Sequence, residues 1–184
     1  MPSPIAHVAA GYLIWKSGGE SLTPKGGRFS SLAAISALAF LSLLPDADAI
    51  PGLLFHDLGR FHNHFSHSFF AGLVTSLILM LAAKALGRPQ PARWLTYGLI
   101  CYWIHLAMDF MTFGRGVMLF WPLSNSRFSS PVKLFSGLHW SEGLWSVRHL
   151  ETILTEVLLV LSAFLLFAAL RKGGLLRPAP RERL

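Results

Sequence analysis

Long apolar runs alternate with short polar segments along the whole chain. Three of the runs approach the roughly 20 residues that a helix needs to cross a hydrocarbon core: residues 69–86, 94–112 and 152–170. A fourth run, residues 29–44, is shorter but uninterrupted and ends at Pro45, so it predicts another transmembrane helix. Residues 4–16 are also apolar but too short to cross alone. They predict a half-span or an interfacial helix at the N-terminus.

This pattern predicts an all-α fold, a polytopic membrane helical bundle with about four transmembrane helices plus the short N-terminal helix. Composition agrees, because 53% of the 184 residues are hydrophobic and only 14% are charged, whereas a soluble domain has about 25% charged residues. No Ser/Gly/Pro-rich linker divides the chain, so we expect residues 1–172 to form a single membrane-embedded domain and residues 173–184 a basic tail. The single cysteine, Cys101, excludes an internal disulfide.

Basic residues are distributed unevenly between the two ends of the predicted helices. Of the 16 Lys and Arg residues, 11 lie at one end and five at the other. Since Lys and Arg in short loops favour the cytoplasmic side, the richer end and the C-terminal tail are predicted to be cytoplasmic, in a bacterial inner membrane. The net charge of +7 is not gathered into a stripe with exposed aromatics, so no nucleic acid partner is expected. The expected partner is the lipid bilayer.

The same topology places all eight histidines at or near the opposite, extracytoplasmic face. Six of the nine carboxylates fall on that face too. Histidine and carboxylate side chains together are the usual ligands of divalent metals such as zinc. The distribution therefore predicts a metal site at the extracytoplasmic ends of the helices.

Two short motifs near this face supply imidazoles. His105 and Asp109 are four residues apart in a predicted helix, so both project from one face and can share a metal. An interhelical hydrogen bond is the alternative for this pair. The segment HNHFSHS provides His62, His64 and His67 just before the span at 69–86. A polar collar at the membrane interface is its alternative, and His64 is the least favoured ligand.

Further candidates lie in loops and near the chain ends. The segment LLPDAD presents Asp46 and Asp48 directly after a span, where Asp46 could instead cap the following turn. His7 is a weak candidate alone but shares the predicted face with the other histidines. Glu151, at the start of the last span, is held in reserve as a further ligand or general acid.

The order of these motifs resembles the YdjM-like family of membrane-bound proteins assigned as metal-dependent hydrolases. The resemblance rests on an N-terminal His7, LPDAD, HNHFSHS and HLAMDFMTFGRGVMLFWP, and runs from residue 5 to about residue 123. The resemblance implies that the positions characteristic of the family are Asp46, Asp48, His62, His67, His105 and Asp109. The chain departs from the family in carrying Asn63-His64 where the family often has Arg-Gly, and Ser66 where it has Thr. More distantly, the set is similar to the zinc-dependent phospholipase C and single-strand nuclease superfamily, but a later HxxxE motif has no clean match, so a three-metal centre is not predicted.

Residues and resemblance together predict a membrane-bound metal-dependent hydrolase of phosphoesters, with a lipid or lipid-linked phosphate as substrate. The expected cofactor is one or two divalent ions, with zinc favoured, and Asp48 and Asp109 are the expected catalytic carboxylates. The alternative is a non-enzymatic membrane protein that binds or conducts metal ions or protons, because intramembrane ionisable residues mark such pathways as well. A structural or partner-binding role with a degenerate site is a third reading. A serine hydrolase is not favoured, because the chain lacks a G-x-S-x-G elbow.

Overall fold

The computed structural model describes residues 2–22, 28–55, 58–138 and 146–175. Within these ranges the chain consists of helices and irregular loops, with two isolated β-bridges and no sheet. The long helices are α1 (Pro4–Ser17), α2 (Arg28–Leu43), α5 (Phe69–Ala85), α6 (Pro91–Phe110) and α7 (Arg148–Lys172). The short elements are η1 (Gly19–Leu22), η2 (Leu44–Ala49), α3 (Ile50–Leu54) and α4 (Leu58–Phe61). The predicted all-helical bundle is confirmed.

Proline and serine set several helix boundaries. Pro4 and Pro91 occupy the first helical positions of α1 and α6, where a missing N–H costs nothing. The α2 helix ends at Leu43 and gives way to the tighter turn of η2, which has Pro45 near its start. Ser68 caps α5, since its Oγ accepts a hydrogen bond from the backbone N of Ala71 at 3.1 Å.

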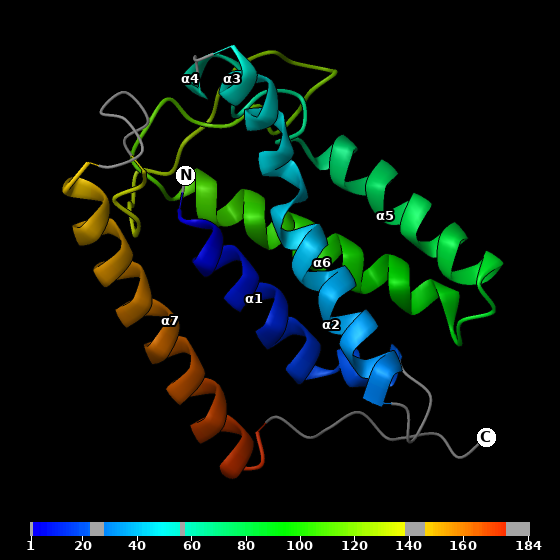
Figure 1. Cartoon of the computed structure of the whole chain (residues 1–184). Coiled ribbons are helices and arrows are strands. Elements are labelled where there is room, and N and C mark those ends of the chain that lie inside the picture. The colour runs from blue at the N-terminus through cyan, green and yellow to red at the C-terminus, as the bar shows by residue number, and fades with distance from the viewer. Residues whose placement is uncertain (1, 23–27, 56–57, 139–145, 176–184) are drawn as a thin grey trace.

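The long helices run alternately up and down (Figure 1). Helices α1 and α2 pack together, α5 and α6 form a second pair, and α2 and α1 both contact α6. Helix α7 packs against α1 and makes no contact with the other long helices of the described chain. The start of α1, the end of α2, the start of α5 and the end of α6 therefore meet at the same end of the bundle (Figure 1).

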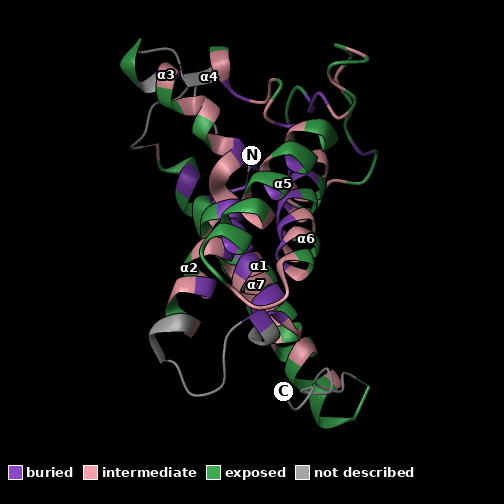
Figure 2. Ribbon diagram, turned by 90° about the vertical axis from the view of Figure 1, so that its right-hand side faces the viewer, coloured by how far each residue is buried: buried purple, intermediate pink, exposed green. Residues whose placement is uncertain are grey.

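The distribution of burial is that of a membrane protein. Ser31–Gly52 and Arg148–Lys172 are long and apolar enough to cross a membrane, and Phe69–Ala85 is a shorter apolar helix. Only 6% of the most apolar stretch of α7 is buried in the protein, and side chains such as Leu158 and Leu165 are exposed along it. Exposed residues line the outer surfaces of the helices, whereas buried ones face the interior of the bundle (Figure 2). Such extended apolar exposure is rare on soluble proteins and suits lipid.

Glycines allow the helices of each pair to approach closely. A Cβ added at Gly11 of α1 would lie 2.6 Å from Oγ of Ser42 and 3.1 Å from the carbonyl O of Leu38, both in α2. A Cβ at Gly72 of α5 would lie 2.8 Å from Cδ1 of Tyr102 in α6. Small residues at such contacts are the usual means of helix association in membranes.

Replacing Gly11 by valine should destabilise the bundle by about 1–3 kcal/mol, the usual cost of forcing extra methyl groups into a packed contact. The displaced residue would be Ser42, which also contacts the site described below. Thermal unfolding of the detergent-purified protein measures the effect, with Val8→Leu on the exposed face of α1 as the matched control. Equal melting temperatures for the two variants would contradict the close packing.

Candidate metal centre

Four segments bring histidines and carboxylates to the end of the bundle where the helix ends meet. The first turn of α1 carries His7, η2 carries Asp46 and Asp48, and the C-terminal half of α6 carries His105 and Asp109. The loop before α5 adds the two histidines His62 and His67. All four segments lie at this end because the helices alternate in direction.

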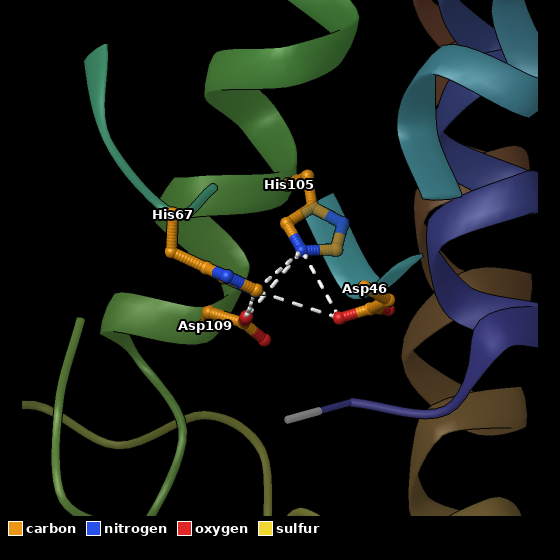
Figure 3. A group of neighbouring side chains, drawn as sticks. All are labelled: Asp46, His67, His105 and Asp109. Atoms are coloured by element: carbon orange, nitrogen blue, oxygen red, sulfur yellow. Dashed lines mark hydrogen bonds and ion pairs between the residues drawn. The ribbon is translucent and has the colours of Figure 1, made fainter. Parts of the chain in front are cut away.

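The centre of the cluster has the dimensions of a tetrahedral metal site (Figure 3). Nε2 of His67 and Nε2 of His105 are 3.3 Å apart, and each lies 3.5 Å from Oδ1 of Asp46. Oδ2 of Asp109 lies 3.0 Å from Nε2 of His67 and 3.4 Å from Nε2 of His105. Four ligands at 2.0–2.1 Å from a tetrahedral zinc ion stand about 3.3–3.4 Å from one another. Asp46, His67, His105 and Asp109 therefore match the size of such a coordination sphere.

Hydrogen bonds at the other ring nitrogens orient the histidines. Nδ1 of His105 donates to the carbonyl O of Ser42 at 2.7 Å, and Nδ1 of His62 donates to Oδ1 of Asp48 at 2.8 Å. Nδ1 of His67 lies 3.1 Å from Oδ2 of the same carboxylate. Because a carbonyl or carboxylate can only accept, each Nδ1 carries a proton, and in the neutral ring Nε2 is the atom left to bind an ion. This is the arrangement of metal-bound histidines.

Asp48 lies behind the histidines. Its Oδ2 also accepts from Oγ of Ser66 at 2.6 Å and from the backbone N of His64 at 3.3 Å. The hydroxyl of Tyr102 in turn donates to the carbonyl O of Ser66 at 2.6 Å. Both oxygens of Asp48 are thereby engaged with the loop, whereas those of Asp46 and Asp109 face the centre.

Several polar atoms of the centre are buried without a hydrogen-bond partner in the described structure. They belong to four side chains that point inward: both oxygens of Asp46 and of Asp109, Nε2 of His62 and both ring nitrogens of His7. Buried carboxylates are costly unless a counter-charge or a ligand satisfies them. A divalent cation supplies that charge, so the residues present fit a metal.

His7 borders the tetrahedral group. Nε2 of His7 lies 4.0 Å from Oδ2 of Asp46 and 3.8 Å from Oδ1 of Asp109. These are the carboxylate oxygens that the tetrahedral group does not use. The ring of His7 stacks on that of His105 at 3.8 Å between centroids. The other set of described side chains whose ligand atoms lie close enough together to hold an ion is Asp48, His62 and His67.

His67 is held by charge as well as by hydrogen bonds. Burial lowers its pKa, but the carboxylates of Asp109, Asp46 and Asp48 outweigh burial and bring the pKa of His67 well above its ordinary value. Without a metal, these carboxylates therefore favour the protonated form of this imidazole. Since a metal binds only the neutral ring, the ion must displace that proton.

The remaining candidates lie apart from the centre. His64 projects away from it, with Nε2 at 2.8 Å from the carbonyl O of Arg60. Glu151 is exposed on α7, where it lines a cavity of about 470 Å³ with Arg148 and Phe113. His56, Asp57, His139 and Glu142 lie outside the described residues.

One buried carboxylate near the site was not among the predicted site residues. Both oxygens of Glu156, in α7, accept from the backbone N of Ser3, at 3.0 and 2.9 Å. Ser3 precedes α1 and lies one turn before His7, so Glu156 holds the start of the helix that presents His7. A carboxylate deep in an apolar span is itself a signal of a functional or structural contact.

Fold and site together define the protein as a helical membrane protein with a buried His/Asp cluster able to hold metal at one end of its bundle. The chain belongs to the YdjM inner membrane protein family, whose sequence profile matches residues 1–175. It is also 30% identical to the inner membrane protein YbcI of Escherichia coli (strain K12) over 142 residues, which cover 71% of this chain and 73% of that protein. No solved structure gives a significant match.

Proposed function

We propose that the protein is a membrane-bound hydrolase that uses one or two divalent ions, with zinc the best fit, to cleave phosphoesters. The observation that carries the proposal is the buried group of Asp46, His67, His105 and Asp109, with ligand spacings of 3.0–3.5 Å. The site lies at one end of a membrane bundle, where it would meet a headgroup. A lipid or lipid-linked phosphate is therefore the proposed substrate.

A bound divalent ion would supply a Lewis acid and lower the pKa of a coordinated water from about 15.7 to near 7. The chain's own residues would hold and orient the reactants. His67, His105, Asp46 and Oδ2 of Asp109 would bind the ion through atoms that face the centre. Asp48 would act as a positioning residue, because His62 and His67 already donate to its two oxygens.

The proposed proton acceptor is the pair formed by His7 and Asp109. Oδ1 of Asp109 lies 3.8 Å from Nε2 of His7 and has no hydrogen-bond partner. With a single ion bound, both groups are placed to accept a proton from an attacking water. This assigns to Asp109 the catalytic role predicted from the sequence and gives Asp48 the role of orienting the imidazoles.

The purified protein, reconstituted with zinc in lipid nanodiscs, should release phosphate or a phosphorylated headgroup from a panel of phosphomonoester and phosphodiester lipids. A general-base group alone contributes on the order of 10²–10⁴ in rate, so Asp109→Asn should lose at least that factor. Release is measured by phosphate assay and by mass spectrometry of the lipids. The non-enzymatic alternative is favoured if the wild type binds stoichiometric metal but cleaves every phosphoester no faster than Asp109→Asn does. Metal and proton flux assays in proteoliposomes would then test that alternative.

We further propose that the centre faces the extracytoplasmic side. The opposite end of the bundle carries basic residues at the ends of several helices, including Lys16, Lys84 and Lys172, and such residues favour the cytoplasm. A fluorescent protein fused after Leu184 should therefore fluoresce, and alkaline phosphatase fused there should be inactive. Alkaline phosphatase fused after Asn125, in the loop following α6, is the matched control and should be active. The reverse pattern would place the centre in the cytoplasm.

A further inference from the structure

Aromatic rings from three segments contact one another at the end of the bundle where α5 begins and α6 ends (Figure 1). The ring of Phe65, in the loop before α5, lies 5.6 Å from that of Trp121 between centroids. The ring of Phe69, at the start of α5, lies 5.9 Å from that of Phe120. The backbone joins the same segments, because N of Phe69 donates to the carbonyl O of Leu119 at 3.0 Å. We call the five connected rings the aromatic patch: Phe65, Phe69, Phe70, Phe120 and Trp121.

The aromatic patch is on the surface of the protein. Its four phenylalanines are exposed. Next to Phe120, the side chain of Leu123 is 93% exposed, in a turn closed by a hydrogen bond from N of Leu123 to the carbonyl O of Phe120 at 2.8 Å. Large apolar side chains gathered and exposed in this way mark an interaction surface.

The patch continues a surface that faces lipid. Along α5 the exposed apolar residues Phe70, Val74, Ile78 and Leu81 follow at spacings of four, four and three, so they lie on one face of the helix. In a helix of an inner membrane protein, such an exposed apolar face contacts acyl chains. Because Phe70 belongs to both this face and the aromatic patch, lipid is the occupant that the patch fits.

The length of α5 gives the depth of the patch. Its 17 residues, at about 1.5 Å each, make a helix of about 25 Å, whereas a hydrocarbon core is about 30 Å thick. Lys84 lies in the last turn of α5 and favours the aqueous boundary, so the missing length falls at the other end, before Phe69. The neighbouring α6 has 20 residues, about 30 Å, and carries His105 and Asp109 in its last two turns.

We propose that the aromatic patch and Leu123 insert into the boundary between headgroups and acyl chains, in the leaflet at the metal-centre end of the bundle. Trp, Phe and Leu side chains are those that favour this boundary. Phe65 lies in the same HNHFSHS loop as His62 and His67, so insertion of its ring holds the candidate metal centre at the level of the headgroups. This depth does not depend on hydrolysis. It also deepens the proposed function, on which this last step rests: a lipid phosphate would meet the centre without leaving its leaflet.

The test is the depth of nitroxide labels on the full-length protein in phosphatidylcholine nanodiscs, measured by electron paramagnetic resonance. The labels are attached through Leu123→Cys or Phe65→Cys, in a Cys101→Ala background that removes the native cysteine. Oxygen concentrates in lipid and a nickel chelate stays in water, so the ratio of their collision rates with the label reports depth. Ser126→Cys, at an exposed polar position of the same segment, is the matched control, and Ile78→Cys on α5 is the reference within the hydrocarbon.

The ratio of oxygen to nickel collisions should be severalfold higher at Leu123 and Phe65 than at Ser126, and closer to the value at Ile78. Ratios at Leu123 and Phe65 equal to that at Ser126 would overturn the proposal, because the patch would then face water. Labels shielded from both reagents and broadened by a second spin would overturn it too, because another copy of the chain would cover the patch. The measurement uses no metal and no substrate, so its outcome is separate from that of the hydrolase proposal.

Discussion

Replacing His105 and Asp109 together by alanine should reduce bound metal from a stoichiometric amount to none. These two residues supply two of the four ligand atoms of the tetrahedral group. Nε2 of His105 lies 3.3 Å from Nε2 of His67 and 3.5 Å from Oδ1 of Asp46. Oδ2 of Asp109 lies 3.0 Å from Nε2 of His67. The atoms left, on Asp46 and His67, no longer surround an ion. Mass spectrometry of detergent-purified protein, calibrated per chain, measures the content after reconstitution with zinc or manganese.

The matched control removes a histidine and a carboxylate outside the cluster, His64→Ala with Glu151→Ala. Neither side chain faces the centre, so this variant should keep its metal. If the wild type binds no metal even after reconstitution, the proposed mechanism is wrong. The cluster would then be a structural or proton-handling polar network.

Asp48→Asn should weaken metal binding by about 10–100-fold without abolishing it, the usual effect of removing a group that orients ligating histidines. Asparagine offers one acceptor oxygen where the carboxylate offers two, so either His62 or His67 loses the acceptor for its Nδ1 proton. That ring is then free to rotate its Nε2 away from the ion. Competition with a chelator of known affinity gives the dissociation constant.

Ser66→Ala is the control for this position. It removes one donor to Oδ2 of Asp48 but leaves the bonds to both imidazoles, so the change in affinity should be several-fold at most. Complete loss of metal in Asp48→Asn would mean that Asp48 is itself a ligand. An unchanged affinity would mean that the loop orients the rings without it.

The helices could be predicted from the sequence because burial in lipid demands uninterrupted apolar runs. The run at 69–86 corresponds to α5 (Phe69–Ala85), and the run at 29–44 to α2 (Arg28–Leu43). The polar motifs could be placed at one end of the bundle because the chain reverses direction after each helix that crosses the membrane. The alternation of helices therefore placed His7 at the same end of the bundle as the other candidate ligands, although His7 is far from them along the chain.

The roles within the cluster depended on geometry that no sequence pattern encodes. Asp46 and Asp48 are two residues apart, yet η2 turns one into the centre and the other behind His62 and His67. Arg115 and Arg127 lie in a segment with no regular period, so their hydrogen bonds to the loop at His62 and Asn63 could not be predicted. The same holds for Glu156, whose partner Ser3 is at the other end of the chain.

The contact between Glu156 and Ser3 joins residues 153 positions apart. It holds the start of α1 through α7, a helix that is synthesised after the other described helices. Until α7 is inserted, the first turn of α1, which carries His7, lacks this anchor. A chain truncated before α7 should therefore lack one contact that holds the His7 end of the candidate centre.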